Sequence, residues 1–396
     1  MVPRDIKAEL LAAAREYPIV TLFGPRQSGK TTLVQAAFPG KPYRSLEDPD
    51  VRRAAELDPR GWLSQLRRGG VLDEIQRSPH LLSYLQGIVD REQKPGLFIL
   101  TGSHQPELHQ AVSQTLAGRT AVLTLLPFSL HELLHYKRRW RPFELIVSGS
   151  FPRLHQHHLK PERFYNGYIQ TYVERDLRSL FIVKDLSRFQ HFLTLLAGRI
   201  GQVMNFSSLG NDLGLSSTTI KQWVSVLKAS YVVLELPPYF ENVGKRVVKS
   251  PKLYFTDIGL ASHLLAISSE DHAFRDPLRG SLYENLIIVE ILKERLNRGL
   301  RPEMYFYRDT HGNEVDLLVR SRGRLLPVEI KSGATFVEDY LRGIDRFRKA
   351  VGARAVAGAI MYNGEERFEV AGTRIFNAFL HDGLGEVALG MPPRRR

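Results

Sequence analysis

The sequence has no cysteine among its 396 residues. Disulfide bonds, thiol catalysis and metal sites built on thiolates are therefore excluded. It also lacks an apolar run long enough to span a bilayer, and its charged first residues, MVPRDIK, contain no apolar signal core. Together with the motif GPRQSGKT at residues 24–31, these absences predict a cytoplasmic protein with no membrane partner. The remaining composition, with 43% hydrophobic and 24% charged residues, is typical of a soluble globular chain.

Acidic residues are outnumbered by basic ones. The 55 lysines and arginines exceed the 42 aspartates and glutamates, which gives a formal net charge of +13. A basic chain of this size predicts a polyanionic partner, and nucleic acid is the first candidate. A surface that is basic only for solubility is the alternative. The length exceeds that of one ordinary hydrophobic core, so two or three domains are expected.

The most specific motif is GPRQSGKT at residues 24–31, which fits the pattern G-x-x-x-x-G-K-[ST] without mismatch. A buried strand is predicted over 17–23 and a helix over 32–38, so the loop faces an anion with the N-terminus of a helix. Lys30 is expected to reach the β- and γ-phosphates of ATP, and the Thr31 hydroxyl to bind Mg²⁺. The residues expected to bind the nucleotide are Gly24, Pro25, Arg26, Gln27, Ser28, Gly29, Lys30, Thr31 and Thr32.

Polar residues follow two later apolar runs. Asp73 and Glu74 end the run GGVL, and Thr101 and Ser103 follow LFIL. Asp73 is expected to hold Mg²⁺ through water or through Thr31, while Glu74 polarises the attacking water. Ligands of open α/β sheets lie beyond the carboxyl ends of the strands. Ser103, or alternatively Thr101, is therefore predicted to sense the γ-phosphate.

Arg119 lies in the segment LAGR, before the apolar run AVLTL. In some P-loop enzymes an arginine supplied by a neighbouring molecule stabilises the charge of the transition state. Arg119 is therefore a candidate catalytic residue that acts in the site of a neighbouring subunit, and this interpretation predicts a homo-oligomer. A surface arginine near the end of a helix is an equal alternative.

The ordered series GPRQSGKTT, VLDEIQR, ILTGS, LAGR, PFSL and SGSFPR resembles the prokaryotic AAA+ ATPases known simply as ATP-binding proteins, close to the archaeal-type ATPases. The resemblance spans nearly the whole chain. It implies ATP and Mg²⁺ as cofactors, a second domain of unknown function after the ATPase core, and a lid in which residues 149–152 pack against adenine. Ser150 stands where a second glycine is usual in this family.

The middle of the chain predicts helical segments. Phe164, Tyr168 and Tyr172 recur at four-residue spacing, which indicates an amphipathic lid helix. Residues 205–227 have the pattern of a helix–turn–helix, in which Gly214 ends the first helix and a serine caps the second.

Two strand-like segments after this motif complete a predicted winged helix. Residues 231–236 and 245–249 are expected to form the wing hairpin. In that arrangement Thr218, Lys221 and Gln222 on the second helix would face a DNA groove. A module that contacts only protein is an equal alternative.

The last third of the chain carries three acids and a lysine in a recognisable order. Glu284 lies near the start of a predicted helix, Asp316 in a predicted strand, and Glu329-x-Lys331 at the end of the next strand. This order resembles the PD-(D/E)xK nuclease fold. Because side chains alternate along a strand, Glu329 and Lys331 are expected on the same face.

The resemblance assigns a chemical role to three of these side chains. Asp316 and Glu329 would offer hard oxygen ligands to Mg²⁺, which polarises a scissile phosphate and lowers the pKa of bound water. Lys331 would orient that water or stabilise developing charge. A domain that uses the same site only to hold DNA is one alternative, and charged residues on an exposed strand face are another.

The sequence therefore predicts an α/β protein with four parts. These are a P-loop AAA+ core over 1–145, a helical lid over 146–200, a winged helix-turn-helix over 201–265 and a restriction-endonuclease-like α/β domain over 266–396. The expected function is Mg²⁺-dependent ATP hydrolysis that drives DNA binding or processing in recombination, repair or defence, branched DNA included. The alternative is a nucleotide-gated switch that binds a protein partner and carries an inactive nuclease-like domain.

Overall fold

The computed structural model describes residues 2–103, 112, 114–173, 186–239 and 250–393. The chain divides into two compact units. Unit 1 consists of Met1–Phe128, Ala229–Tyr231 and Leu296–Leu300. Unit 2 consists of Ser129–Lys228, Val232–Arg295 and Arg301–Arg396. The main break thus follows Phe128, and the sequence boundary at 145 falls inside unit 2.

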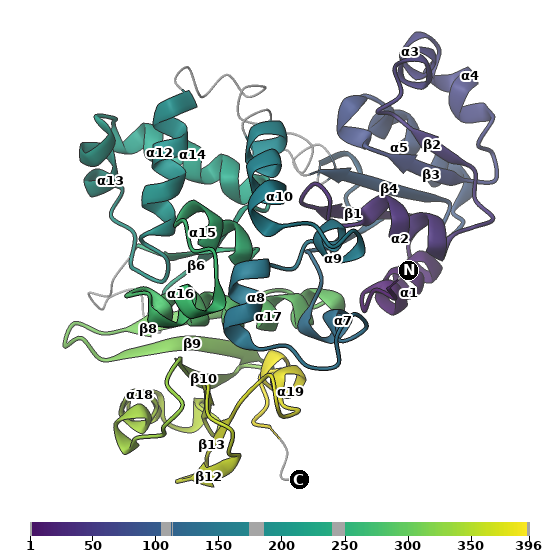
Figure 1. Cartoon of the computed structure of the whole chain (residues 1–396). Coiled ribbons are helices and arrows are strands. Elements are labelled where there is room, and N and C mark those ends of the chain that lie inside the picture. Colours follow the sequence, from purple (N-terminus) through teal and green to yellow (C-terminus); the bar gives the residue numbers. More distant parts are fainter. Residues whose placement is uncertain (1, 104–111, 113, 174–185, 240–249, 394–396) are drawn as a thin grey trace. The chain divides into compact units, whose positions relative to one another are not determined.

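Unit 1 is built on a parallel five-stranded sheet with the order β2-β3-β4-β1-β5 (Figure 1). The strands are β1 Ile19–Gly24, β2 Tyr43–Ser45, β3 Gly70–Asp73, β4 Phe98–Ser103 and β5 Thr120–Thr124. The helices are α1 Lys7–Glu16, α2 Lys30–Ala37, α3 Pro49–Leu57, α4 Pro59–Ser64 and α5 Leu81–Glu92, with a 3₁₀ turn at Ile75–Arg77. Strands β1, β3 and β4 are buried along their whole length, as expected for a parallel sheet covered on both faces.

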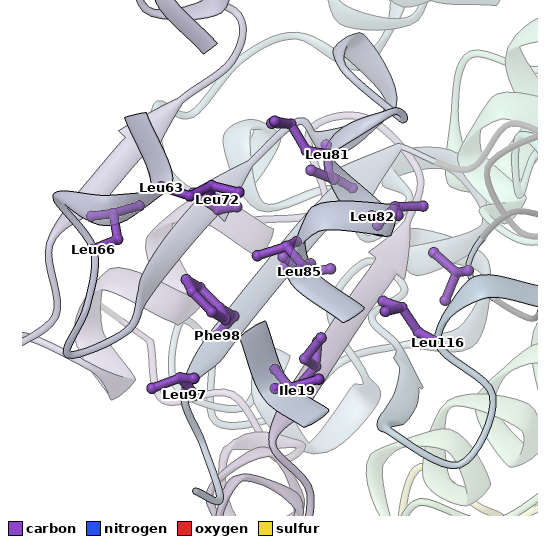
Figure 2. Packing of buried hydrophobic residues seen from close by; sticks show 14 of the residues in the cluster. Ile19, Leu63, Leu66, Leu72, Leu81, Leu82, Leu85, Leu97, Phe98 and Leu116 are labelled. Atoms are coloured by element: carbon purple, nitrogen blue, oxygen red, sulfur yellow. The ribbon is translucent and has the colours of Figure 1, made fainter. Parts of the chain in front are cut away.

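Alternating side chains of the central strands face two separate apolar layers. Leu72 and Phe98 pack with leucines of α4 and α5 on one face, as Figure 2 shows. Val71 and Ile99, each one residue away, pack on the other face with α1 and α2. This packing holds β1, β3 and β4 in register, so their carboxyl ends reach the same edge of the sheet.

The first part of unit 2 is mainly helical. Its helices are α7 Leu130–Leu133, α8 Pro142–Ser148, α9 Pro152–Gln156, α10 Pro161–Tyr168, α12 Leu186–Ala197, α13 Phe206–Leu213, α14 Ser217–Ala229, α15 Ile258–Leu264 and α16 Glu270–Arg275, with a π turn at Ile169–Val173. Strand β6 Val233–Leu236 pairs with β7 Lys252–Phe255 in an antiparallel hairpin. Gly214 ends α13 in the left-handed conformation, as the sequence predicts. The predicted wing strand at 245–249 lies outside the described residues.

The second part of unit 2 contains a six-stranded mixed sheet with the order β12-β13-β11-β10-β9-β8 (Figure 1). Its strands are β8 Met304–Arg308, β9 Glu314–Ser321, β10 Arg324–Lys331, β11 Ala359–Tyr362, β12 Phe368–Val370 and β13 Thr373–Phe376. The helices are α17 Arg279–Asn297, α18 Arg342–Val351 and α19 Leu384–Ala388, with 3₁₀ turns at Glu338–Leu341 and Gly352–Arg354. Throughout the described stretches, no helix combines the length and the apolar character that crossing a membrane requires.

One glycine shows how closely β3 approaches its neighbour. Gly69 has φ +86°, and a Cβ atom there would lie 1.9 Å from the carbonyl oxygen of Leu97. We therefore expect Gly69→Ala to destabilise unit 1 by about 2 kcal/mol or more, through backbone strain and a backbone clash. Gly87 on α5 is the matched control, since a Cβ there meets nothing within 4 Å. Gly87→Ala should instead stabilise the helix by up to about 1 kcal/mol. Urea unfolding followed by circular dichroism measures both, and equal midpoints would contradict this packing.

Candidate nucleotide site and acidic cluster

The loop between β1 and α2 depends on two glycines. A Cβ on Gly24 would lie 2.1 Å from the carbonyl oxygen of Leu125, so only glycine fits there. Gly29 caps α2 with φ +92°, in the left-handed region that favours glycine. Among the other predicted nucleotide-binding residues, Pro25 is buried, Arg26 is half-buried, and Thr32 is exposed at the start of α2.

Several polar atoms inside this loop can form further hydrogen bonds. Among the described residues, the buried Ser28 Oγ and Gln27 Oε1 have no hydrogen-bond partner. The buried Lys30 Nζ donates to the carbonyl oxygens of Gly24, at 3.0 Å, and Pro25, at 2.8 Å. Buried polar atoms without partners mark places where a ligand belongs. The loop therefore fits a polyphosphate, and Lys30 is the cation within reach of it.

Asp73 at the end of β3 accepts hydrogen bonds from three hydroxyl groups. Thr31 Oγ1 donates to Asp73 Oδ2 at 2.8 Å, the Tyr43 hydroxyl donates to the same oxygen at 2.6 Å, and Thr101 donates to Oδ1. Burial, followed by the hydrogen bond to Asp73, raises the pKa of Tyr43, so this hydroxyl stays protonated. The structure thus joins Thr31 and Asp73, which are oxygen ligands of the kind Mg²⁺ prefers.

Glu74 is held in place by its neighbours. Its backbone has φ +57°, which is uncommon for a residue other than glycine. Ser103 Oγ donates to Glu74 Oε2 at 3.1 Å, and Gln76 Nε2 donates to the same carboxylate. Gln76 also donates to Ser103 at 3.1 Å. Glu74 and Ser103, which the sequence predicts separately as site residues, therefore meet at the sheet edge, whereas Thr101 contacts Asp73.

Arg119 lies at the other edge of the same sheet. Its carbonyl oxygen accepts from the amide of Ile19, the first residue of β1, while the P-loop follows the last residue of that strand. Its guanidinium forms two hydrogen bonds with the Asp90 carboxylate, at 2.5 and 2.9 Å. The fold therefore does not bring Arg119 to the P-loop of its own chain.

Arg4 is a residue of this site that sequence patterns do not reveal. Its guanidinium donates to the carbonyl oxygens of Ser28, at 2.6 Å, and Leu126, at 2.7 Å, and lies 4.9 Å from the ring centre of Phe128. Arg4 thus holds the P-loop against the segment after β5. An isolated arginine before a helix carries no motif, and the same is true of Tyr43 in its short strand.

The three acids and the lysine of the last third also come together, within unit 2. Lys331 Nζ lies 2.6 Å from Glu329 Oε2 and 3.1 Å from Asp316 Oδ2. The amide of Ile330 donates to Asp316 at 2.8 Å. Burial and the nearby Asp316 raise the pKa of Glu329 well above its ordinary value. Glu329 and Lys331 lie on the same face of β10, as alternation predicts.

Strand β7 brings two further side chains to Glu284 on α17. Lys252 Nζ lies 3.2 Å from Glu284 Oε1 and 2.6 Å from Glu314 Oε1. The Tyr254 hydroxyl donates to Glu284 at 2.5 Å. Burial raises the pKa of Glu284 to about 7, and the charge of Asp316 acts in the same direction. We call Lys252, Glu284, Glu314, Asp316, Glu329 and Lys331 the acidic cluster.

The two sites differ in how well they fit Mg²⁺. Among the described residues, no group of three or more His, Asp or Glu side chains could hold a metal ion. The P-loop site needs only Thr31 and Asp73 from the protein, because phosphates and water supply the other ligands of Mg²⁺ in such sites. In the acidic cluster, an ammonium group already contacts one oxygen of each of the four carboxylates. As folded, the acidic cluster does not fit Mg²⁺ on Asp316 and Glu329.

Comparison with known proteins assigns three segments of the chain. Residues 16–134 match the model of an AAA domain, 140–271 that of the domain of unknown function DUF8612, and 279–379 that of the domain of unknown function DUF4143. "Uncharacterized protein Rv2008c" of Mycobacterium tuberculosis is 32% identical over 378 residues, which cover 93% of this chain and 82% of the relative. The chain belongs to the family of Rv2008c.

Weaker matches include two archaeal proteins. "Uncharacterized protein MJ1637" of Methanocaldococcus jannaschii is 21% identical over 390 residues, covering 84% of this chain and 80% of the relative. The Walker-type ATPase of Pyrococcus abyssi is 17% identical with a TM-score of 0.41, covering 67% of this chain and 96% of that one. The match to the AAA domain confirms the predicted AAA+ core and supports ATPase activity.

Loss of the Arg4 contacts should weaken nucleotide binding. We expect Arg4→Met to lower the affinity for ATP about tenfold, because charged hydrogen bonds to two carbonyl groups are lost beside the P-loop. Arg4→Lys should recover part of this loss. Arg15→Met, at an exposed position of α1, is the control and should bind as the parent does. Titration with a fluorescent ATP analogue measures the affinities, and parental binding by Arg4→Met would contradict the role assigned to Arg4.

Proposed function

We propose that this chain is a Mg²⁺-dependent ATP hydrolase whose activity drives DNA binding by unit 2, in the cytoplasm. The observation that carries the ATPase assignment is the meeting of Lys30, Thr31, Asp73, Glu74 and Ser103 at one edge of the unit 1 sheet. Mg²⁺, when bound, neutralises phosphate charge. Lys30 stabilises charge on the phosphates, Glu74 polarises the attacking water, and Ser103 orients the Glu74 carboxylate.

Variants at Glu74 and Lys30 distinguish the hydrolysis of ATP from its binding. We expect Glu74→Gln to lower the rate of phosphate release about a hundredfold or more while ATP still binds, since the base is lost but the loop is intact. Lys30→Ala should lose both binding and hydrolysis. Glu92→Gln, at an exposed position of α5, is the control and should keep the parental rate. Hydrolysis by Glu74→Gln at the parental rate would show that the base is another residue.

The DNA-binding part of the proposal is supported by the helices of unit 2. Helices α12, α13 and α14 are followed by the hairpin β6–β7, and Val203 forms an additional bridge to Lys252 of that hairpin. This order is the one expected of a winged helix. Thr218, Lys221 and Gln222 are all exposed on α14, the helix that would enter a groove.

A basic face lies on α18. Arg342, Arg346 and Lys349 are exposed, while Ile344 and Phe347 on the opposite side are buried in the sheet domain. Exposed cations on one helical face, in a chain with net charge +13, are suited to a phosphate backbone. The order of α17, β8, β9, β10, α18 and β11 is also compatible with the proposed restriction-endonuclease-like fold.

Salt dependence tests the DNA-binding proposal. Fluorescence anisotropy measures the affinity for single-stranded, duplex and branched DNA. The logarithm of each association constant should fall linearly with the logarithm of the salt concentration. Lys221→Ala and Arg346→Ala should each lower the slope by about one. Arg91→Ala, at an exposed position of α5 in unit 1, should leave the slope unchanged. Absence of binding at low salt, or binding indifferent to salt, would overturn this part of the proposal.

A second candidate function is favoured by the acidic cluster itself. Because Lys252 and Lys331 form ion pairs with all four carboxylates, the cluster suits a chain without nuclease activity that acts as a nucleotide-gated switch for a protein partner. An ATPase activity that is indifferent to DNA and stimulated by a protein would favour this function over DNA binding. In either case we propose that Arg119 acts in the site of a neighbouring copy.

A further inference from the structure

Lys252 is a buried cation held by acids from other elements. Its side chain is 4% exposed, and its Nζ lies 5.4 Å from the ring centre of Phe306 on β8. Although burial lowers the pKa of Lys252, the carboxylates of Glu284, Asp316 and Glu314 outweigh that effect and raise it. A buried lysine keeps its charge when nearby carboxylates compensate the loss of water. Lys252 is therefore a charged, fixed part of the acidic cluster.

The backbone of Lys252 is fixed as firmly as its side chain. Lys252 pairs with Leu236 across the hairpin and forms a β-bridge with Val203 on its other side. Next to it, Tyr254 donates to Glu284, and the buried Asn285 bonds both the amide and the carbonyl of Phe255. Hydrogen bonds thus link β7 to α17 at several positions, and they fix where the Lys252 ammonium group lies in the cluster.

The two lysines divide the four carboxylates between them. Lys252 bridges Glu284 on α17 and Glu314 on β9, and Lys331 bridges Asp316 on β9 and Glu329 on β10. A divalent cation in such a cluster would also bridge carboxylates from different elements, and it would bring the same two positive charges. The pair of ammonium groups supplies this charge without a metal.

We propose that Lys252 takes the place of a divalent cation in the acidic cluster, so that the cluster joins the hairpin β6–β7 to α17 and β9 and binds no metal while Lys252 is present. The inference goes beyond the ATPase and DNA-binding proposals and depends on neither. It assigns a latent site for a hard divalent cation such as Mn²⁺ or Mg²⁺, which removal of the Lys252 charge would open.

The test uses the full chain without nucleotide, in which Lys252→Met keeps the length of the side chain and removes its charge. Lys252→Met should unfold at a lower temperature than the parent, because Glu284 and Glu314 lose their compensating charge. Mn²⁺ should raise that temperature by several degrees and bind at least about tenfold more tightly than to the parent. Adding Glu284→Gln to Lys252→Met should abolish the effect of Mn²⁺. Lys252→Arg should behave as the parent.

Direct titration of Mn²⁺ keeps the inference testable even if Lys252→Met fails to fold. Asp73→Asn removes the metal ligand of the P-loop site, and this variant with Lys252 intact should bind no Mn²⁺ stoichiometrically. Stoichiometric binding that Glu329→Gln then removes would overturn the inference, because the cluster would hold a metal beside Lys252. A folded Lys252→Met chain with parental affinity for Mn²⁺ would overturn it as well.

Discussion

Parallel strands end at one edge of a sheet, and this constraint assembles the nucleotide site. The loop that follows β1, the carboxylates that follow β3 and the hydroxyls at the end of β4 are far apart in sequence. They meet because the apolar layers on both faces hold β1, β3 and β4 in register. The hydrogen bond from Thr31 to Asp73 and that from Ser103 to Glu74 then follow from the order of the strands.

The two groups of acids are compensated by different kinds of partner. Asp73 and Glu74 accept hydrogen bonds from hydroxyl and amide groups, which are neutral. Neutral donors leave the negative charge in place for a cation that arrives with the nucleotide. The acids around Lys252 and Lys331 are instead paired with ammonium groups. Unit 1 therefore keeps the charges of Asp73 and Glu74 available to a cation, whereas in unit 2 two ammonium groups offset part of the charge of four carboxylates.

Chemistry that needs residues within one segment could be predicted from the sequence. Gly24, Gly29 and Lys30 belong to one phosphate-binding loop, so their spacing is a local pattern. Glu329 and Lys331 lie on one face of one strand, so their spacing is local as well. Much of the fold was predictable for the same reason, since apolar runs and helical spacing are local signals. The acids of the last third were predicted as a group because a resemblance supplied their order.

Residues that act through distant pairing could not be predicted in this way. Arg4 bonds a carbonyl 24 positions away, and its segment carries no pattern that indicates this contact. Lys252 contacts Glu284, 32 positions away, from a strand that pairs with β6. The break after Phe128 likewise depends on packing between distant segments rather than on any local change in composition.

The most direct measurement of the central claim is the rate of phosphate release from ATP by the parent chain, with and without Mg²⁺ and DNA. The account predicts release that requires Mg²⁺ and rises when DNA is added. Release that is no faster than in buffer without protein, at saturating ATP and Mg²⁺ and with each form of DNA present, would contradict it.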